Sequence, residues 1–355
     1  MTRSLFFDIH GLIKIQINTE SRFDFLKDIN FFLSYFEVKS IIDPDIILNI
    51  GKFSPSNSDC FIVDHKYYIK DNYFYCKDQE GRAKWEVEIF GFEKGKAIIN
   101  FYGRILGIEQ VLIPDYLAQN LILRPIIELK LLEKEYIIIH GLGMSKDGKG
   151  IIIAARGGLH KTRVAMELIN NKRIKLIGDD RILIGKSIVY SFPLFYKTVV
   201  FRARKLEDQN ITSLFQKIKL LYFLLEYKKT SFKDYFENRC ILSFFGIGAR
   251  KERIYDIRIC PSLKNDLMIR LINNDKMEKI STGIKSFGFV PFYKYMLIYS
   301  YIYPKSNIII FWEKYSKLLK ENLPSNISLI LFPKIFDDEI INFYKNIFDT
   351  SIYDT

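Results

Sequence analysis

The sequence is short of the residues that build disulfide frameworks and metal sites. Its 355 residues include only 4 cysteines and 4 histidines. None of the cysteines is part of a C-x-x-C pair, so we expect free, packed thiols in a reducing compartment, which favours a cytoplasmic protein. No pair of histidines has the spacing that would place two ligands on one helix face, and we therefore expect no zinc site.

Long apolar runs are also scarce. The longest apolar stretch, residues 287–303, contains Lys294 and is shorter than the roughly 20 residues that a membrane-spanning helix needs. The apolar run near the amino terminus is interrupted by Asp8 and His10, and no small-residue cleavage site follows it. We therefore expect a strand there rather than a signal peptide, and no membrane partner.

Charged residues are plentiful but scattered. The 53 lysines and arginines exceed the 41 acidic residues and give a net charge of +12, which favours anionic partners such as nucleotides, nucleic acids or acidic membranes. Basic residues form only short clusters, for example Lys228-Lys229 and Arg250-Lys251, and there is no basic tail. We therefore expect no nucleic-acid partner.

The first part of the chain, residues 1–112, is predicted to form a β-rich, α+β amino-terminal domain. Short segments rich in Ile, Val, Phe and Tyr alternate with polar turns, which is typical of strands. These segments are residues 12–17, 46–50, 61–69, 73–76, 85–90 and 96–102. A helix at 22–36 interrupts them, with its apolar residues at helical spacing.

The rest of the chain is predicted to be α/β. A helical segment at 115–135 contains Pro125, which should kink or divide it. Residues 113–265 are predicted to form the second domain, with a helix at 210–229 and strands at 186–192, 240–245 and 254–260. Residues 266–355 form an extension that either completes the second domain's α/β layer or makes a small appendage. Its predicted elements are strands at 307–312 and 327–332 and helices at 313–320 and 337–348.

The stretch 136–184 carries the clearest chemical signal. It is predicted to run from a strand at 136–140 through a polar turn containing Asp147-Gly148 to a second strand at 151–154. A glycine-bearing loop then leads into a helix, and a strand at 174–177 follows. A loop that opens a helix presents unpaired N–H groups and the positive end of the helix dipole, so it suits phosphate oxygens.

The loop matches the phosphate-loop pattern G-x-x-x-x-G-K-S/T in part. The residues that fit are Gly157, Gly158, Lys161 and Thr162, whereas Ala155 and His160 replace the two glycines that define the pattern. A side chain at position 160 restricts dihedral angles that glycine reaches freely, and it crowds the phosphate position. Taken alone, the loop is either a nucleotide-binding loop or an ordinary turn between a strand and a helix.

Acidic residues follow the next strand. If the strands on either side of the helix run parallel, their carboxyl ends share one edge of the sheet, and Lys161, Asp179 and His140 would meet there. The alternatives without a catalytic role are that His140 is a hydrogen-bonded, partly buried residue at a strand end and that Asp179-Asp180 forms a turn or a helix cap. A lysine, a metal ion and a carboxylate together are what phosphoryl transfer needs.

These features resemble the catalytic domain of HPr kinase/phosphorylase and the broader group of HprK-like kinases. The resemblance is carried by His140-Gly141, the loop 155–162 and Asp179-Asp180, with similar spacing, and more weakly by the glycine-containing segment 244–250. The resemblance implies that residues 113–265 are a P-loop HPr kinase-like catalytic domain. The implied fold class is α/β, with the β-rich domain preceding the kinase domain.

The resemblance also implies site residues. The catalytic group would be Asp179, which takes the acceptor's proton, with His140 lining the pocket and Lys161 binding phosphate. ATP would be held by Arg156, Gly157, Gly158, Leu159, His160, Lys161 and Thr162. Mg²⁺ would be bound by Thr162, while Asp180 either orients the metal or caps the following strand.

The predicted function is therefore ATP-dependent phosphoryl transfer to a hydroxyl group. The acceptor could be a protein serine, a free amino acid or a sugar, but the region that recognises the HPr protein is not evident. The alternative is an inactive nucleotide-binding, assembly or sensor module in which His160 closes the phosphate site. Enzymes of this family assemble into oligomers, so the resemblance leaves homo-oligomerisation open.

Overall fold

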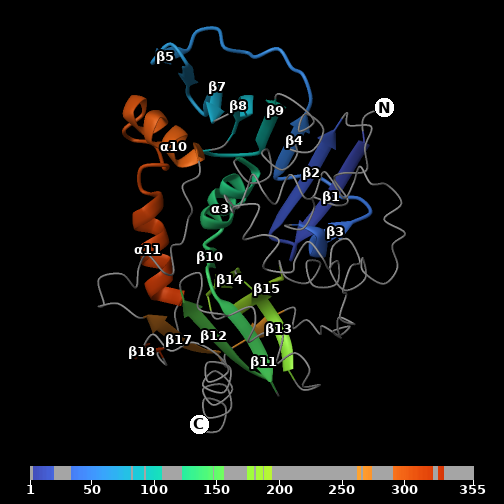
Figure 1. Ribbon diagram of the computed structural model, residues 1–355, viewed down its shortest axis with the longest axis vertical. Helices are drawn as coiled ribbons and strands as arrows, with labels where there is room; N and C mark the ends of the chain where they lie inside the picture. The colour runs from blue at the N-terminus through green and yellow to red at the C-terminus, as the bar shows by residue number, and fades with distance from the viewer. Residues whose placement is uncertain are drawn as a thin grey trace, which may run out of the picture. The chain divides into compact units, whose positions relative to one another are not determined.

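In the residues that the computed structural model describes, the fold is a mixed α/β arrangement with two strand-rich sheets and few helices (Figure 1). The structure describes residues 3–19, 33–80, 83–91, 93–105, 122–146, 148–155, 174–179, 181–186, 188–193, 262–264, 267–273, 291–322 and 327–331. Outside these residues lie the predicted helices at 210–229 and 337–348, most of the helix at 22–36, and the strands at 240–245 and 254–260.

The chain divides into two compact units. One contains residues 1–194 together with 258–355, and the other contains residues 195–257. All of the described residues belong to the first unit. The domain boundaries predicted at residues 112 and 265 stay predictions.

The first sheet has nine strands in the order β3-β1-β2-β4-β9-β8-β7-β6-β5. Strands β2, β4 and β9 run parallel, and the other neighbouring strands are antiparallel. Buried and partly exposed residues alternate along β1, β2 and β4, as expected for strands with one face in the core. The strands are β1 (Arg3–Ile9), β2 (Ile13–Thr19), β3 (Glu37–Val38), β4 (Ile46–Ile50), β5 (Phe61–Val63), β6 (Tyr67–Lys70), β7 (Tyr73–Glu80), β8 (Ala83–Phe90) and β9 (Ala97–Ile105).

The strand segments predicted within residues 1–112 all belong to the first sheet, and one of them differs from its prediction. The segment predicted as a single strand at 61–69 is a hairpin of β5 and β6, because Asp64 and His65 adopt positive φ angles of 53° and 50° and turn the chain. These are residue types that tolerate the left-handed region. The short 3-10 helix η1 (Ser34–Phe36) precedes β3.

Amide side chains form a hydrogen-bonded row across the first sheet. Asn18 donates to Asn49 at 2.8 Å, and Asn49 donates to Asn100 at 2.9 Å. Asn100 in turn donates to Glu88 at 2.8 Å. The members of each pair are opposite each other in the strand register. A slip of one residue would carry an amide to the other face, so the row fixes the register of β2, β4, β9 and β8.

The second sheet also has nine strands. Eight follow the order β10-β14-β15-β13-β11-β12-β17-β18, and β16 pairs with β15. The strands are β10 (Ile137–Ile139), β11 (Leu142–Lys146), β12 (Lys149–Ala155), β13 (Ile174–Asp179), β14 (Ile182–Gly185), β15 (Ile188–Pro193), β16 (Ser262–Lys264), β17 (Leu267–Asn273) and β18 (Ile327–Leu331). Because β17 pairs with β12 and β18 pairs with β17, the last third of the chain completes this sheet.

Two sequence predictions differ from the structure, and a third, at Pro125, is tested only in part. The strand predicted at 136–140 is β10, which pairs with β14, and a separate strand, β11, forms the hairpin with β12 through Gly148 at a φ of 85°. Pro125 lies in the first turn of α3 (Arg124–Glu133), where a missing N–H costs nothing. Most of the chain that was predicted to be helical before it lies outside the described residues, so a kink or division at Pro125 stays a prediction. The strand predicted at 307–312 is wrong, since these residues form turns and begin α11 (Phe311–Asn322).

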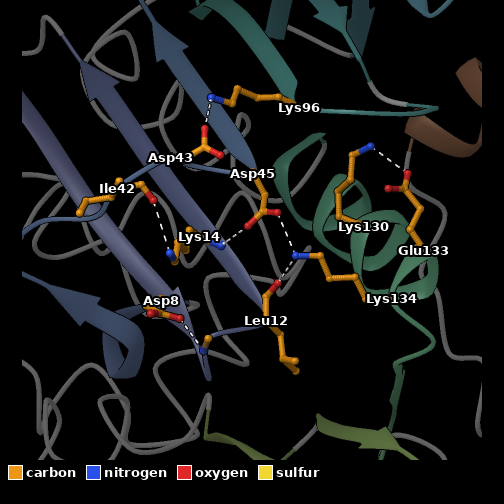
Figure 2. Close-up of polar contacts among 11 residues, drawn as sticks. Asp8, Leu12, Lys14, Ile42, Asp43, Asp45, Lys96, Lys130, Glu133 and Lys134 are labelled. Carbon is orange, nitrogen blue, oxygen red and sulfur yellow. Dashed lines mark hydrogen bonds and ion pairs between the residues drawn. The ribbon is translucent and has the colours of Figure 1, made fainter.

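Helix α3 is tied to the first sheet at its carboxyl end (Figure 2). The Lys134 amine contacts the carbonyl oxygen of Leu12 at 2.5 Å and the Asp45 carboxylate at 2.9 Å. The other oxygen of Asp45 accepts the backbone N–H of Lys14 at 2.8 Å. One carboxylate therefore links the strands of the first sheet to the helix.

Two further helices pack on the sheets through tyrosine hydroxyls. In α10 (Pro291–Ile302), Tyr295 accepts a hydrogen bond from Trp85 Nε1 at 3.0 Å and donates to Asp78 at 3.0 Å. In α11, Tyr315 donates to the carbonyl oxygen of Ile138 in β10 at 2.9 Å. In the described part of the chain, no helix is long and apolar enough to cross a membrane.

His10, at the tip of the β1–β2 hairpin, contacts the second sheet. Its Nε2 lies 2.7 Å from the carbonyl oxygen of Ser191 in β15, and its ring stacks on Tyr190 at 4.8 Å. Burial lowers the pKa of His10 below the ordinary value, and this effect outweighs the opposing effects of the Ser191 hydrogen bond and the Asp8 carboxylate. The ring is therefore neutral near pH 7 and donates from Nε2.

Replacing Tyr295 by Phe should lower the free energy of unfolding by about 1–3 kcal/mol, because it leaves the Trp85 N–H and an Asp78 oxygen without their buried partner. Urea denaturation measures the change. The matched control is Tyr301→Phe, which should leave stability unchanged because Tyr301 is 82% exposed. Equal stability of the two variants would contradict the hydrogen-bonding role of Tyr295.

The lowered pKa of His10 predicts a pH-dependent stability. In the unfolded chain the imidazole has its ordinary pKa of about 6.5, so the unfolded state binds more protons than the folded state below this pH. The free energy of unfolding should therefore fall as the pH drops through about 6.5. The variant His10→Asn tolerates the same positive φ and cannot titrate, so its pH curve should lack this component. Parallel curves from pH 7.5 to 5 would contradict the assignment.

Candidate functional site

The order and direction of strands at the centre of the second sheet define the candidate site. Strand β11 lies between β12 and β13 and is antiparallel to both, so β12 and β13 run parallel to each other. Leu142 at the start of β11 is opposite Ile153 of β12, and Gly143 is opposite Gly178 of β13. The start of β11 and the carboxyl ends of β12 and β13 therefore share one edge of the sheet.

The same edge receives the carboxyl ends of other strands. β17 is parallel to β12, β18 is parallel to β17, and β15 is parallel to β13. Ala155, Asp179, Pro193, Asn273 and Leu331 are consequently the last strand residues on this side. In open α/β sheets, ligands bind beyond the carboxyl ends of the parallel strands. This edge is therefore the candidate functional site.

Two of the predicted site residues, His140 and Asp179, belong to the described part of the chain, and both lie at this edge. His140 is partly buried and lies two residues before β11, and Asp179 is the last residue of β13. The phosphate-type loop begins directly after the last residue of β12, Ala155. Outside the described residues lie Asp180 and the whole set Arg156, Gly157, Gly158, Leu159, His160, Lys161 and Thr162.

Gly178 fixes a tight turn just where the acidic pair occurs. A Cβ atom at this position would lie 2.1 Å from the carbonyl oxygen of Arg181 and 3.3 Å from a side-chain carbon of Ile182. Only glycine allows the two backbone segments to approach so closely. The turn that carries Asp179 therefore depends on Gly178.

Two opposite charges are buried next to this turn. Arg181 is 3% exposed, and its Nη1 lies 3.7 Å from Oε1 of Glu128 in α3, a residue that is 7% exposed. The same carboxylate oxygen accepts a hydrogen bond from Nε of Arg124 at 3.4 Å. The acidic turn is thus connected to α3 by an ionic contact in the protein interior.

Gly178, Arg181 and Glu128 were missed by the sequence reasoning. The glycine directly before the acidic pair was the available signal for a tight turn, since Gly, Asp and Asn dominate turns. Arg181 could have been noticed as a basic residue directly between the acidic pair and the apolar strand that begins at Ile182. Glu128 had no such signal, because its partner lies 53 positions away and was brought close only by tertiary packing.

A carboxylate at a strand end can accept a proton or bind a hard cation such as Mg²⁺. Among the described residues, no cluster of three or more His, Cys, Asp or Glu side chains could hold a metal ion. No family model matches the chain, and no curated protein matches it significantly.

Replacing Gly178 by Ala should destabilise the protein by about 1–3 kcal/mol or more, because the new methyl group overlaps the Arg181 carbonyl oxygen. Thermal and urea denaturation measure the effect. The control is Gly148→Asn in the β11–β12 turn, where a Cβ meets nothing within 4 Å and Asn tolerates the positive φ. Wild-type stability of Gly178→Ala would show that the turn is not constrained as described.

Proposed function

We propose that the chain is an ATP-dependent phosphotransferase of the HprK-like kind, which transfers a phosphoryl group to a hydroxyl group. The observation that supports this most is the shared sheet edge, at which the strand preceding the phosphate-type loop, the strand ending in Asp179 and the start of β11 after His140 come together. The resemblance requires these segments to meet, and a random match of motifs does not.

Each residue has a role in this proposal. The loop N–H groups and Lys161 bind the phosphates, as expected for a loop that leads into a helix. Asp179 takes the proton of the acceptor hydroxyl, and His140 lines the pocket. The hydroxyl of Thr162 and the carboxylate of Asp180 are hard oxygen ligands and suit Mg²⁺, which neutralises phosphate charge when bound.

Phosphoryl transfer makes modest chemical demands that such a site meets. The protein must hold donor and acceptor in line and stabilise negative charge, and it needs no covalent intermediate. A net charge of +12 also favours the approach of a polyanion such as ATP. The acceptor is a hydroxyl compound, either a protein serine or a small molecule.

The second candidate function is an inactive nucleotide-binding, assembly or sensor module. The sequence supports it at one position, His160, where the phosphate-loop pattern has glycine. An imidazole there restricts the loop and crowds the phosphate. The two proposals differ in whether Mg·ATP binds and turns over.

Calorimetry with Mg·ATP and Mg²⁺-dependent release of ADP test the proposal. The kinase proposal predicts binding and turnover, a loss of turnover of about 100-fold or more in Lys161→Ala, and a loss of about 100-fold or more in Asp179→Asn. Lys175→Ala is the matched control, because this lysine is exposed on β13 and should not affect either measurement.

The outcomes separate the two candidates. Absence of binding heat and of thermal stabilisation at millimolar Mg·ATP would favour the inactive module, since a ligand of the folded state must stabilise it. His160→Gly should then bind Mg·ATP more tightly than the wild type if the imidazole is the obstacle. Full turnover in Lys161→Ala or Asp179→Asn would refute the roles given to these residues.

A further inference from the structure

Charged residues seldom lie inside a protein, and Arg181 and Glu128 both do. Arg181 is 3% exposed and Glu128 is 7% exposed, with 3.7 Å between their nearest charged atoms. Removing two charges from water costs several kcal/mol per ion, and an apolar pair of similar volume is often as stable or more stable. Stability alone is therefore a weak reason for this pair, and a role in setting geometry is the better explanation.

The position of the pair indicates what geometry it sets. Arg181 closes the turn after β13, and its carbonyl oxygen approaches Gly178 so closely that a methyl group would not fit. Because Gly178 and Arg181 approach so closely, a displacement of Arg181 would also displace Asp179, which lies between them in the sequence. Ile182, next to Arg181, pairs with Ile139 of β10, so the far side of the turn is also fixed.

The other partner, Glu128, lies on a helix that is held in place by several contacts. Its helix, α3, is buried along most of its length and is held at its carboxyl end by the contacts of Lys134 with Leu12 and Asp45 (Figure 2). Arg124 contacts the same Glu128 oxygen as Arg181 does and so orients the carboxylate from within the helix. The carboxylate is thus a fixed point against which the arginine is placed.

We propose that Glu128 and Arg181 are positioning residues, which hold the turn that carries Asp179 at the sheet edge. This inference rests on the proposed phosphotransferase function for its catalytic meaning, although the positioning itself can be measured without activity. Neither residue needs to touch the substrate. Glu128 and Arg181 act by setting the position of the turn that carries Asp179.

Glu128→Gln tests the proposal, with Glu133→Gln as the matched control. Glu133 lies on the same helix, is paired with Lys130 at 2.8 Å, and undergoes the same chemical change. Amide hydrogen exchange in residues 179–183 should become about tenfold faster or more in Glu128→Gln, with the first sheet unchanged. Glu133→Gln should leave exchange in the turn as in the wild type.

Turnover provides a second readout. In Glu128→Gln, Mg²⁺-dependent ADP release should fall about tenfold or more, while the calorimetric Kd for Mg·ATP should stay within about twofold, as expected when a catalytic group is misplaced but binding is kept. A wild type that neither binds nor hydrolyses Mg·ATP would refute the kinase proposal. The exchange experiment would still decide whether the pair positions the turn.

The double variant Glu128→Met/Arg181→Met covers the case in which the single variant does not fold. It removes both charges of this pair, so it avoids the cost of removing only one partner of a buried ion pair. Fast exchange in the turn of this variant supports positioning by the ion pair. Wild-type exchange in the turn of the double variant, or turn exchange in Glu128→Gln equal to that of Glu133→Gln, would overturn the proposal.

Discussion

The antiparallel pairing of β11 with both of its neighbours is the constraint on which the candidate site depends. It makes β12 and β13 parallel although they are not neighbours in the sheet, and it brings the start of β11 to the edge where they end. Side chains pack closely around Gly143, where a Cβ would lie 2.9 Å from the terminal carbon of the Ile182 side chain and 3.1 Å from the Cβ of Ile177. The start of β11 and the carboxyl ends of β12 and β13 thereby share one edge.

Much of the first sheet was predictable from the sequence, since alternating burial leaves a pattern with a period of two. The segment 307–312 shows the limit of this reasoning. It is rich in apolar residues, yet Ile309 and Ile310 are 50% and 43% exposed, and Phe311 begins a helix whose buried residues Phe311, Tyr315 and Leu318 follow a helical period. A short apolar run does not distinguish a strand from a turn that leads into a helix.

Two strands of the candidate site could be predicted from the sequence, but the strand between them and the contacts that hold the acidic turn could not. The strand at 174–177 and the hairpin turn at Gly148 are as expected, and parallel strands were expected to bring Asp179 to the loop. The intervening β11 was not expected, because strand order is set by packing over the whole sheet. The contact of Arg181 with Glu128 depends on the same packing, and no local sequence pattern predicts it.

The amide row of the first sheet has one more consequence, which concerns its last member. Glu88 is 1% exposed, and its carboxylate accepts hydrogen bonds from Asn100, from the Tyr73 hydroxyl at 2.9 Å and from the Ser56 backbone at 2.7 Å. All amides of the row donate in the same direction, so their dipoles point their positive ends toward this anion and reinforce one another. A sheet, whose backbone dipoles largely cancel, thus gains through its side chains an oriented field that solvates a negative charge with neutral groups.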